Sequence, residues 1–421
     1  MTAQLLKDVQ LLQGPAQPLQ RSDVLIEQGV ITAIGTGAGA EATRRGLLPR
    51  PAGSWLLAPA LVDPHSVLEE PEDGRAETLG SLVRSAAAAG YGTVALLPRA
   101  RNWRDRPECL RLRAEPPFEL PLWGGFSLGG RGDDLSAHAD LLAAGALGLA
   151  EEGELPPLPL LERGLSIGEC ADRPVLLAPR NASLDHGGFV REGVEALRAG
   201  WPLDPPLSET IPLQNLLALA ASLPEVRLRL ANLSTAAGVQ LLRAAETAPM
   251  ATVCWWHLVA DSGSLDPVAE GWRLVPSLGT PADRRALVEA LADGVISAVA
   301  VHHQPLDPEE QLLPLDQRRP GLAGHRYVLP LLWQQLVREQ GWSAAALWEA
   351  LCWGPARLLA LEPPALAVGS RRWILFDPDQ EWTPRADGEA SKAANQPLAG
   401  ERLRGQVLAT GLLPELWLGP H

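Results

Sequence analysis

The sequence contains few lysines and few cysteines. Two lysines and four cysteines occur among 421 residues. The cysteines, at positions 109, 170, 254 and 352, show no Cys-x-x-Cys spacing, which argues against a zinc knuckle and against a disulfide framework. We therefore expect free thiols and a reducing, cytoplasmic environment.

Long hydrophobic runs and basic clusters are also missing. No apolar run reaches the roughly 18 residues that a membrane helix needs, and residues 1–12 lack the basic start and long apolar core of a secretory signal. The formal net charge is −14, and no long basic cluster is present that could follow a phosphate backbone. These absences predict a soluble protein that binds neither a membrane nor nucleic acid.

Hydrophobic residues, in contrast, make up 46% of the chain. That content is enough for one large domain with a small satellite domain. Alternating apolar and polar residues predict short strands at 4–12 and 23–35, the second with a hairpin turn at Gln28-Gly29. Residues 1–55 are therefore predicted to form the first part of a small β-domain.

Between residues 56 and 362, short apolar runs alternate with helical stretches rich in alanine and leucine. The predicted strands are 92–97, 174–177, 226–230, 251–254 and 295–301, and the predicted helices include 78–89, 235–247 and 281–292. This alternation indicates parallel βα units, and a (β/α)8 barrel of the TIM type is the usual closed form at this length. Residues 116–135 and 155–161 are predicted to be loops over the barrel face.

Strand patterns return after residue 365, at 372–377 and 403–409, with a polar segment between them at 384–397. We predict that 363–421 complete the β-domain and that the polar segment is a surface loop. The expected fold class is therefore α/β, a (β/α)8 barrel with a small β-sandwich domain formed by the N- and C-terminal segments.

Several segments, in this order, resemble the dihydroorotases of the cyclic amidohydrolase superfamily. The main ones are Leu61-Val-Asp-Pro-His65, Ala86-Ala-Ala-Ala-Gly-Tyr-Gly-Thr-Val94, Gly354-Pro-Ala-Arg-Leu-Leu359 and Ser391-Lys-Ala-Ala-Asn-Gln-Pro-Leu398. The resemblance covers nearly the whole chain. It implies an amidohydrolase-type barrel in which active relatives hydrolyse a cyclic amide with a zinc-activated hydroxide.

The resemblance also implies where the ligands of metal and substrate should lie, and the first of these positions depart from the family pattern. In Asp-x-His-x-His-x-Arg, the first histidine is His65, the second aligns with Val67, and the arginine aligns with Glu69. This last change reverses the charge offered to an anionic substrate. Arg99 stands where the family has a substrate-binding asparagine.

The later positions depart from the pattern in the same way. Two further histidine ligands align with Ala178 and Asn232, neither of which replaces an imidazole at zinc. The asparagine of the family's Asn-Pro-Pro-Leu aligns with Val275. In Asp-His-Ala-Pro-His, the aspartate that binds metal and shuttles a proton aligns with His302, and the last histidine aligns with Leu306.

Only His65 and one of Glu151 and Glu152, a pair that resembles the family's Asp-Asp-Gly, remain as candidate metal ligands. Two ligands hold no catalytic zinc, so no cofactor is expected and no catalytic residue is assigned. Each candidate also has a structural interpretation: His65 as a hydrogen-bonded residue and the glutamates as a solvated loop. A new metal site formed by His65, His257 and His302 is a further alternative.

The sequence therefore predicts a non-catalytic homologue that supports another enzyme. The resemblance implies a partner, because inactive homologues in the dihydroorotase family assemble with aspartate transcarbamoylase in pyrimidine biosynthesis. That enzyme, or an active dihydroorotase, is the candidate partner in a homo- or hetero-oligomer. The alternatives are a zinc-dependent dihydroorotase or cyclic amidase with weak or altered activity, and a small-molecule sensor whose pocket is defined by Glu69 and Arg99. The basic run 99–106 either binds an anion or forms an exposed face.

Overall fold

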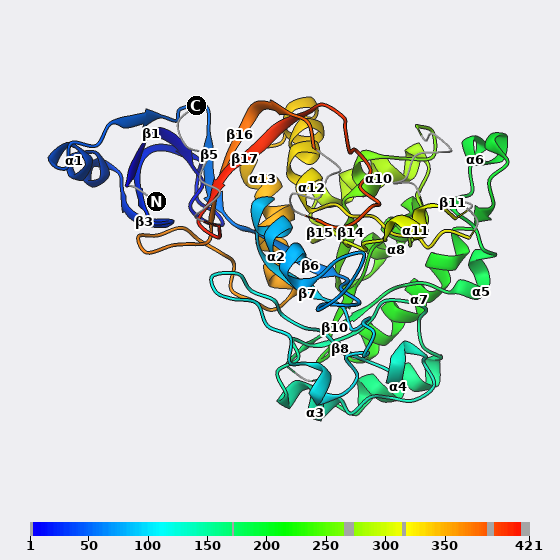
Figure 1. The fold of residues 1–421 in the computed structure, drawn as a ribbon. Coiled ribbons are helices and arrows are strands. Elements are labelled where there is room, and N and C mark those ends of the chain that lie inside the picture. The colour runs from blue at the N-terminus through cyan, green and yellow to red at the C-terminus, as the bar shows by residue number, and fades with distance from the viewer. Residues whose placement is uncertain (1–2, 171, 265–272, 314–316, 385–390, 414–421) are drawn as a thin grey trace.

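The computed structural model describes residues 3–170, 172–264, 273–313, 317–384 and 391–413 (Figure 1). A small β-domain, whose N-terminal strands are blue and whose C-terminal strands are orange and red in Figure 1, lies at one side of a larger α/β barrel. Among the described residues, no helix is long and apolar enough to cross a membrane.

The small domain is one curved sheet built from both ends of the chain. Its strand order is β17-β16-β5-β1-β2-β3, and β4 pairs with β1. The strands are β1 (Gln4–Leu11), β2 (Gln20–Glu27), β3 (Val30–Ile34), β4 (Pro49–Pro51), β5 (Leu56–Pro59), β16 (Trp373–Trp382) and β17 (Leu403–Thr410), and helix α1 (Thr36–Arg44) follows β3. The predicted turn joins β2 to β3 with positive φ at both Gln28 and Gly29, as a type I′ hairpin requires.

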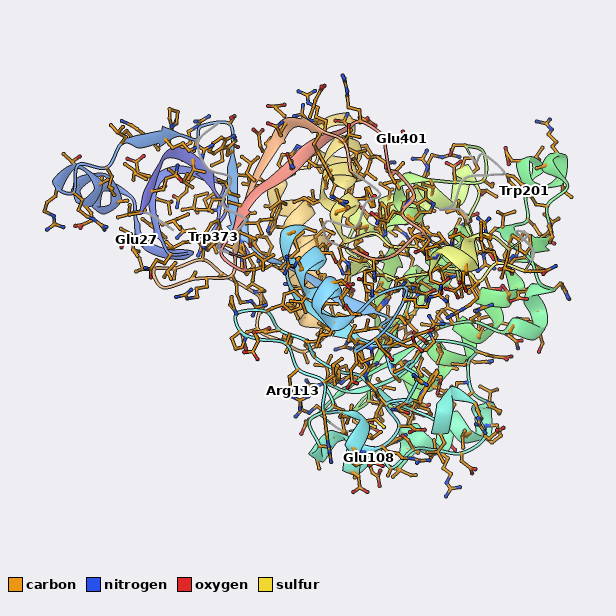
Figure 2. All side chains as sticks on the ribbon, viewed as in Figure 1. Glu27, Glu108, Arg113, Trp201, Trp373 and Glu401 are labelled. Atoms are coloured by element: carbon orange, nitrogen blue, oxygen red, sulfur yellow. The ribbon has the colours of Figure 1, made fainter. Side chains whose placement is uncertain are left out.

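Antiparallel pairing of β5 with β16 joins the two ends of the chain. Trp373, which lies where the domain meets the barrel (Figure 2), is fully buried and donates from Nε1 to the carbonyl of Gly29 at 2.8 Å. It packs in one core with Leu11 and Leu57. Strands from the C-terminal segment therefore lie in the same sheet as the N-terminal strands.

The barrel contains a six-stranded parallel sheet in the order β15-β14-β13-β10-β9-β8 and the parallel pair β6-β7. Isolated parallel bridges join the β7 region to the segment before β8. At the other side, the amide of Val301 donates to the Asp63 carboxylate on β6 and so links β15 to β6. The strands are β6 (Leu61–Ser66), β7 (Tyr91–Leu96), β8 (Gly124–Gly125), β9 (Leu149–Glu151), β10 (Pro174–Leu177), β13 (Arg227–Leu230), β14 (Met250–Cys254) and β15 (Ala298–Ala300).

Helices follow most of these strands and begin where the sequence supplies a cap. Thr78 and Thr280 each cap a helix with a reciprocal capping box, and Pro281 occupies the first turn of the second. The main barrel helices are α2 (Leu79–Ala88), α3 (His138–Ala143), α4 (Leu158–Ser166), α7 (Leu207–Ser222), α8 (Ala236–Ala244), α10 (Pro281–Ala292), α12 (His325–Leu332), α13 (Ala344–Trp348) and α14 (Gly354–Leu358). Shorter elements are α5 (Ala182–Asp185), β11 (Val190–Arg191), α6 (Val194–Ala199), β12 (Leu203–Asp204), α9 (Trp256–Val259), α11 (Pro308–Gln311), the 3-10 turns Pro107–Cys109 and Leu128–Gly130, and the π-helical segments Trp333–Glu339 and Glu349–Trp353.

Two of the three predicted loops contain regular structure. The segment 116–135 includes β8, whose two glycines hide the strand pattern although Gly124 donates to the carbonyl of Gly148. The proline-rich segment 155–161 includes the start of α4. Both predictions relied on glycine and proline as signals of loops, and here these residues occur within a barrel strand and the first turn of a helix.

The third predicted loop, 384–397, is described only at residue 384 and from residue 391 onward, and its described end is largely buried. Asn395 is 1% exposed. Its side chain accepts from the amide of Leu306 and donates to the carbonyl of Gln304, both at 2.9 Å. The polar side chains that suggested a surface loop therefore bind the backbone at the barrel mouth, where they satisfy buried polar groups.

Candidate functional site

The carboxyl ends of the barrel strands surround one small buried cavity. Its lining includes His65, Glu152, Ala178, Asn232, Val275 and His302. Val67, Glu69, Arg99, Glu151 and Leu306 do not line it. The first group converges as expected for the ends of parallel strands in a barrel. The cavity measures about 20 Å³, which is room for about one water molecule.

A chain of hydrogen bonds between uncharged groups crosses this site. His65, at the end of β6, places its Nδ1 3.2 Å from Nδ1 of His302, and its Nε2 lies 2.9 Å from Oγ1 of Thr252. Burial lowers the pKa of His65 to about 4 and holds the pKa of His302 well below its ordinary value. Both rings are therefore neutral at pH 7, and one must donate to the other.

Gln304 fixes the direction of this chain. In the amide orientation that satisfies both of its polar atoms, its oxygen accepts from Nε2 of His302 at 2.9 Å and from Nη2 of Arg99 at 3.0 Å. His302 then accepts at Nδ1 from His65, and His65 accepts at Nε2 from the Thr252 hydroxyl. The free lone pair of each imidazole is therefore engaged within the protein.

Arg99 introduces a fixed positive charge beside the cavity. Its Nε lies 2.9 Å from Glu152 and 3.4 Å from Glu69, and the contact with Glu152 is an ion pair without hydrogen-bond alignment. Burial raises the pKa of Glu152, while the guanidinium of Arg99 acts in the opposite direction. Glu69 also pairs with Arg319, whose Nη2 lies 2.5 Å from Oε1 of Glu69. Nη1 of Arg319 lies 3.0 Å from Oε1 of Glu310. Alternating charges thus extend across the mouth of the barrel.

Glu151 has a different environment from its neighbour. It ends β9, is 4% exposed, and accepts at Oε2 from both the amide and the hydroxyl of Ser127, at 3.1 and 2.6 Å. Burial raises the pKa of Glu151 to about 7, although the bonds from Ser127 oppose the rise. The interpretation of Glu151 and Glu152 as a solvated loop is therefore wrong, because both side chains are buried at a strand end.

The residues present do not fit a catalytic zinc ion. Such a site needs about three protein donors with free lone pairs, but Ala178 and Val275 supply none and the imidazoles are engaged. His257 does not line the cavity with His65 and His302, and its Nε2 lies 3.3 Å from the carbonyl of Ser277. Within the described parts of the chain, no group of three or more His, Cys, Asp or Glu residues could hold a metal ion.

A second buried cluster, which the sequence reasoning missed, lies behind the cavity. Asp63 contacts Nε2 of His325 at 3.0 Å, and Glu77 contacts Nε2 of His303 at 3.3 Å. Burial lowers the pKa of His325, against the effect of Asp63. Glu77 also accepts from the Ser391 hydroxyl. Strand alternation could not have identified this cluster, because β15 ends at Ala300, before His302 and His303. Through these contacts, His325 at the start of α12 binds Asp63 on β6, and Glu77 just before α2 binds His303 and Ser391 of the C-terminal segment.

Comparison with known proteins places this geometry in a family. No family model matches the chain. A probable dihydroorotase-like protein of Synechocystis is 35% identical over 398 residues, which cover 85% of this chain and 88% of that protein. A dihydroorotase-like protein of Pseudomonas aeruginosa is 31% identical over 411 residues, 94% of this chain and 95% of that protein. The chain belongs to the dihydroorotase-like proteins.

This dihydroorotase-like protein is also similar to a dihydroorotase of Listeria welshimeri, at 28% identity over 424 residues, which cover 96% of each chain. Among solved structures, D-hydantoinase from Thermus sp. has a TM-score of 0.78 at 18% identity and covers 97% of this chain and 94% of that chain. L-hydantoinase from Arthrobacter aurescens has a TM-score of 0.76 at the same identity, with the same coverage. These likenesses confirm the predicted TIM-type amidohydrolase fold.

Proposed function

We propose that this dihydroorotase-like protein is a non-catalytic subunit that supports a partner enzyme. The observation that carries the proposal is the hydrogen-bond chain from Thr252 through His65 and His302 to Gln304, because it leaves neither imidazole a free lone pair. A metal hydrolase needs those electrons for its ion. The guanidinium of Arg99 adds a positive charge where a divalent cation would have to approach.

The size of the cavity supports the same proposal. About 20 Å³ remains at the strand ends, whereas pockets that take small-molecule ligands usually measure about 300–1,000 Å³. A cyclic amide could enter only after side chains that line the cavity had moved apart. Movement of Glu152, which lines it, would separate this buried carboxylate from its counter-ion Arg99.

The test is a measurement of zinc and of turnover on the same purified protein. We expect well under one equivalent of zinc by plasma emission, and no hydrolysis of dihydroorotate before or after incubation with zinc. An active dihydroorotase carried through the same purification and incubation is the control. Stoichiometric zinc, or hydrolysis that a chelator abolishes, would overturn the proposal.

Aspartate transcarbamoylase is the proposed partner, on the resemblance to inactive homologues that assemble with that enzyme. The proposal places both proteins in the cytosol, supported by four free cysteines. Size-exclusion chromatography of the two proteins from one source, separately and mixed, tests it. We expect a new peak of larger size that contains both chains. Unchanged elution of each protein in the mixture would count against this partner, and an active dihydroorotase would then be tested in the same way.

One observation favours the rival function, a cyclic amidase with weak or altered activity. Glu151 has a pKa of about 7, which suits a general base at neutral pH. Its carboxylate faces Ser127, however, and it does not line the cavity. Assays on hydantoin and dihydropyrimidine rings, whose hydrolases share this fold, distinguish the two functions. Turnover that survives in the Glu151→Gln variant would exclude Glu151 as its base.

A further inference from the structure

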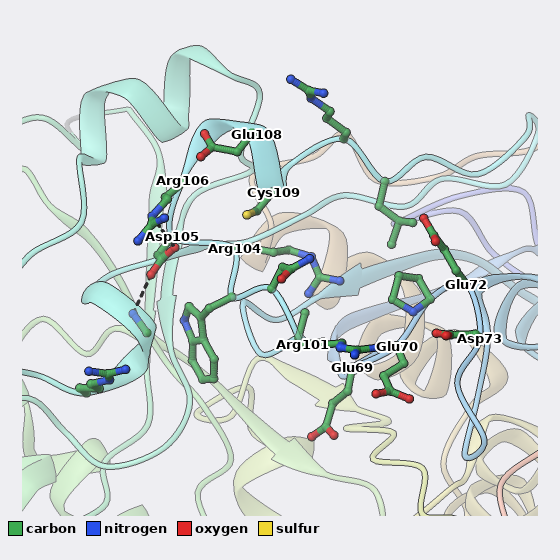
Figure 3. A pocket seen from close by; sticks show the side chains of 18 residues that line it. Glu69, Glu70, Glu72, Asp73, Arg101, Arg104, Asp105, Arg106, Glu108 and Cys109 are labelled. Carbon is green, nitrogen blue, oxygen red and sulfur yellow. Dashed lines mark hydrogen bonds and ion pairs between the residues drawn. The ribbon is translucent and has the colours of Figure 1, made fainter.

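A large cavity lies outside the closed centre. It measures about 840 Å³ and is lined by residues 69–73, 100–106, 108, 109, 111, 112, 129 and 131 (Figure 3). These segments follow β6, β7 and β8 at the carboxyl ends of the strands. The cavity lies beside the Glu69–Arg99 ion pair, but Arg99 does not line it. It therefore offers space that the strand-end site lacks.

Arg104 lines this cavity, which we call the cleft, and hydrogen bonds hold its side chain in place. The residue is 2% exposed, and its guanidinium donates to the carbonyls of Leu97 and Leu68 at 2.5 and 3.3 Å. The amide of Arg101 donates to the carbonyl of Glu69 at 2.9 Å and joins the same two loops. Burial lowers the pKa of Arg104 to about 10, so it stays charged at neutral pH. No described carboxylate forms an ion pair with it.

The cleft carries both carboxylates and guanidinium groups. Figure 3 shows Glu72 and Asp73 on one side of Arg104, the side where Arg101 also lies, and Arg106 beside Asp105 on the other. Exposed arginines at 101, 111 and 131 also line the cleft. Across the described chain, neither these three guanidinium groups nor the carboxylates of Glu72 and Asp73 form a side-chain ion pair. The opposing charges therefore remain available to a ligand.

The pattern of charge selects the kind of ligand. A ligand with only negative groups would be repelled by the carboxylates of the cleft, and a ligand with only positive groups by its arginines. Guanidinium groups bind carboxylates and phosphates well. Trp103 adds an apolar surface at fixed position, because a Cβ on Gly130 would lie 2.2 Å from its ring. Pockets of this volume suit ligands about as large as a short peptide.

We propose that this cleft binds a dipolar ligand about as large as a short peptide. Its carboxylate or phosphate group pairs with Arg101 and Arg111, and its ammonium or guanidinium group pairs with Glu72 and Asp73. The proposal does not depend on whether the strand-end site is catalytic. It also reassigns the predicted sensor pocket, because Arg99 is already paired whereas, among the described residues, Arg101, Arg111 and Arg131 of the cleft form no side-chain ion pair.

Blocked tetrapeptides test the selection by charge. The probes are acetylated and amidated Asp-Gly-Gly-Lys, Asp-Gly-Gly-Asp and Lys-Gly-Gly-Lys, whose ends carry no charge. Isothermal titration at low salt should show that the dipolar peptide binds at least tenfold more tightly than either of the others. Equal affinity for all three, or no binding of the dipolar peptide at millimolar concentration, would overturn the proposal.

Variants and a cysteine reporter test whether the dipolar peptide binds in the cleft. Arg101→Glu combined with Arg111→Glu should weaken the dipolar peptide at least tenfold, whereas Arg285→Glu, which makes one of the same charge changes on α10, should leave affinity within twofold. Cys109 lines the cleft and is the only described cysteine that is not buried. The dipolar peptide should therefore slow alkylation of Cys109. Binding that the double variant does not weaken, or that leaves alkylation unchanged, would place the ligand elsewhere and reject the cleft.

Discussion

Single buried side chains in this protein take their charge state from their immediate neighbours. His65 and Glu151 both end barrel strands and are almost fully buried. Burial disfavours the charged form of each, so the pKa of His65 falls to about 4 and that of Glu151 rises to about 7. Burial thus drives both strand-end residues toward their uncharged forms.

The variant Glu151→Gln tests this at the residue scale. Because the pKa of Glu151 is higher in the folded state, about 7 against 4.5, the folded protein binds more protons between these values and loses stability as pH rises through them. A shift of this size corresponds to about 3 kcal/mol. We therefore expect the difference in free energy of unfolding, variant minus wild type, to increase by about 3 kcal/mol from pH 4.5 to pH 8.

Urea denaturation of both proteins at a series of pH values measures this difference. Glutamine keeps an oxygen that can accept from Ser127, so the comparison isolates the charge. The control is Glu154→Gln, a change at an exposed position of the following turn. Stability curves that stay parallel for wild type and the Glu151 variant would show that the carboxyl titrates normally.

At the scale of elements, the sequence predicted the bounds of a strand or helix where the apolar pattern and the length of the segment were unambiguous. Strand β10 and helix α10 occur at the predicted residues. Strand β15 is shorter than predicted and ends at Ala300, before His302 adopts a left-handed backbone with φ 49°. The ends of parallel strands converge in any barrel, so the grouping of Ala178, Asn232 and His302 around one cavity followed from the fold.

Other parts of the site could not be predicted from the elements alone. The ion pair of Arg99 with Glu152 joins the ends of two strands that are not neighbours in the chain. Glu151 accepts hydrogen bonds from Ser127, which lies within the segment 116–135 that was predicted to be a loop over the barrel face. Sequence patterns report which face of a strand is apolar, but they do not report which loop folds over its end.

Restoring ligands at the strand ends tests the importance of that ion pair. A five-fold variant would carry Val67→His, Glu69→Arg, Ala178→His, Asn232→His and His302→Asp. We expect it to bind well under one equivalent of zinc while Arg99 remains, because the guanidinium neutralises Glu152 and repels a divalent ion. Adding Arg99→Asn should raise the zinc content to about one equivalent.

Equilibrium dialysis followed by plasma emission measures both variants. Thermal melts of each, compared with wild type, establish that both are folded. We expect little hydrolysis of dihydroorotate in either variant, because ligands bind a metal more readily than they arrange the groups around it for catalysis. Equal zinc content with and without Arg99 would show that its charge does not control the site.

At the scale of the whole molecule, the β-domain depends on strands from both ends of the chain. Pairing of β5 with β16 covers the edge of the N-terminal strands, and Trp373 completes their core. A chain that stops at residue 365 lacks β16 and β17, and also the segment containing Asn395 that binds the barrel mouth. We expect this truncated chain to aggregate or to be digested rapidly, because an apolar strand edge is exposed.

Limited proteolysis and size-exclusion chromatography measure the effect of the truncation. A chain that ends at residue 413, and so retains β17, is the matched control and should resist the protease as the full chain does. A truncated chain that elutes as a compact species and resists digestion would mean that the N-terminal strands fold without their C-terminal partners.

The shared sheet also sets an order of events during synthesis. Pro59 ends β5 and Trp373 begins β16, so a ribosome must add about 310 residues between the two partners. At typical elongation rates this takes roughly 15 to 60 s. During that interval the barrel can begin to form. Leu56 and Leu57 of β5 then still lack their pairing partner, β16. We therefore expect β5 and the strands paired with it to be the part of the nascent chain that chaperones bind and that mispairs with other nascent chains.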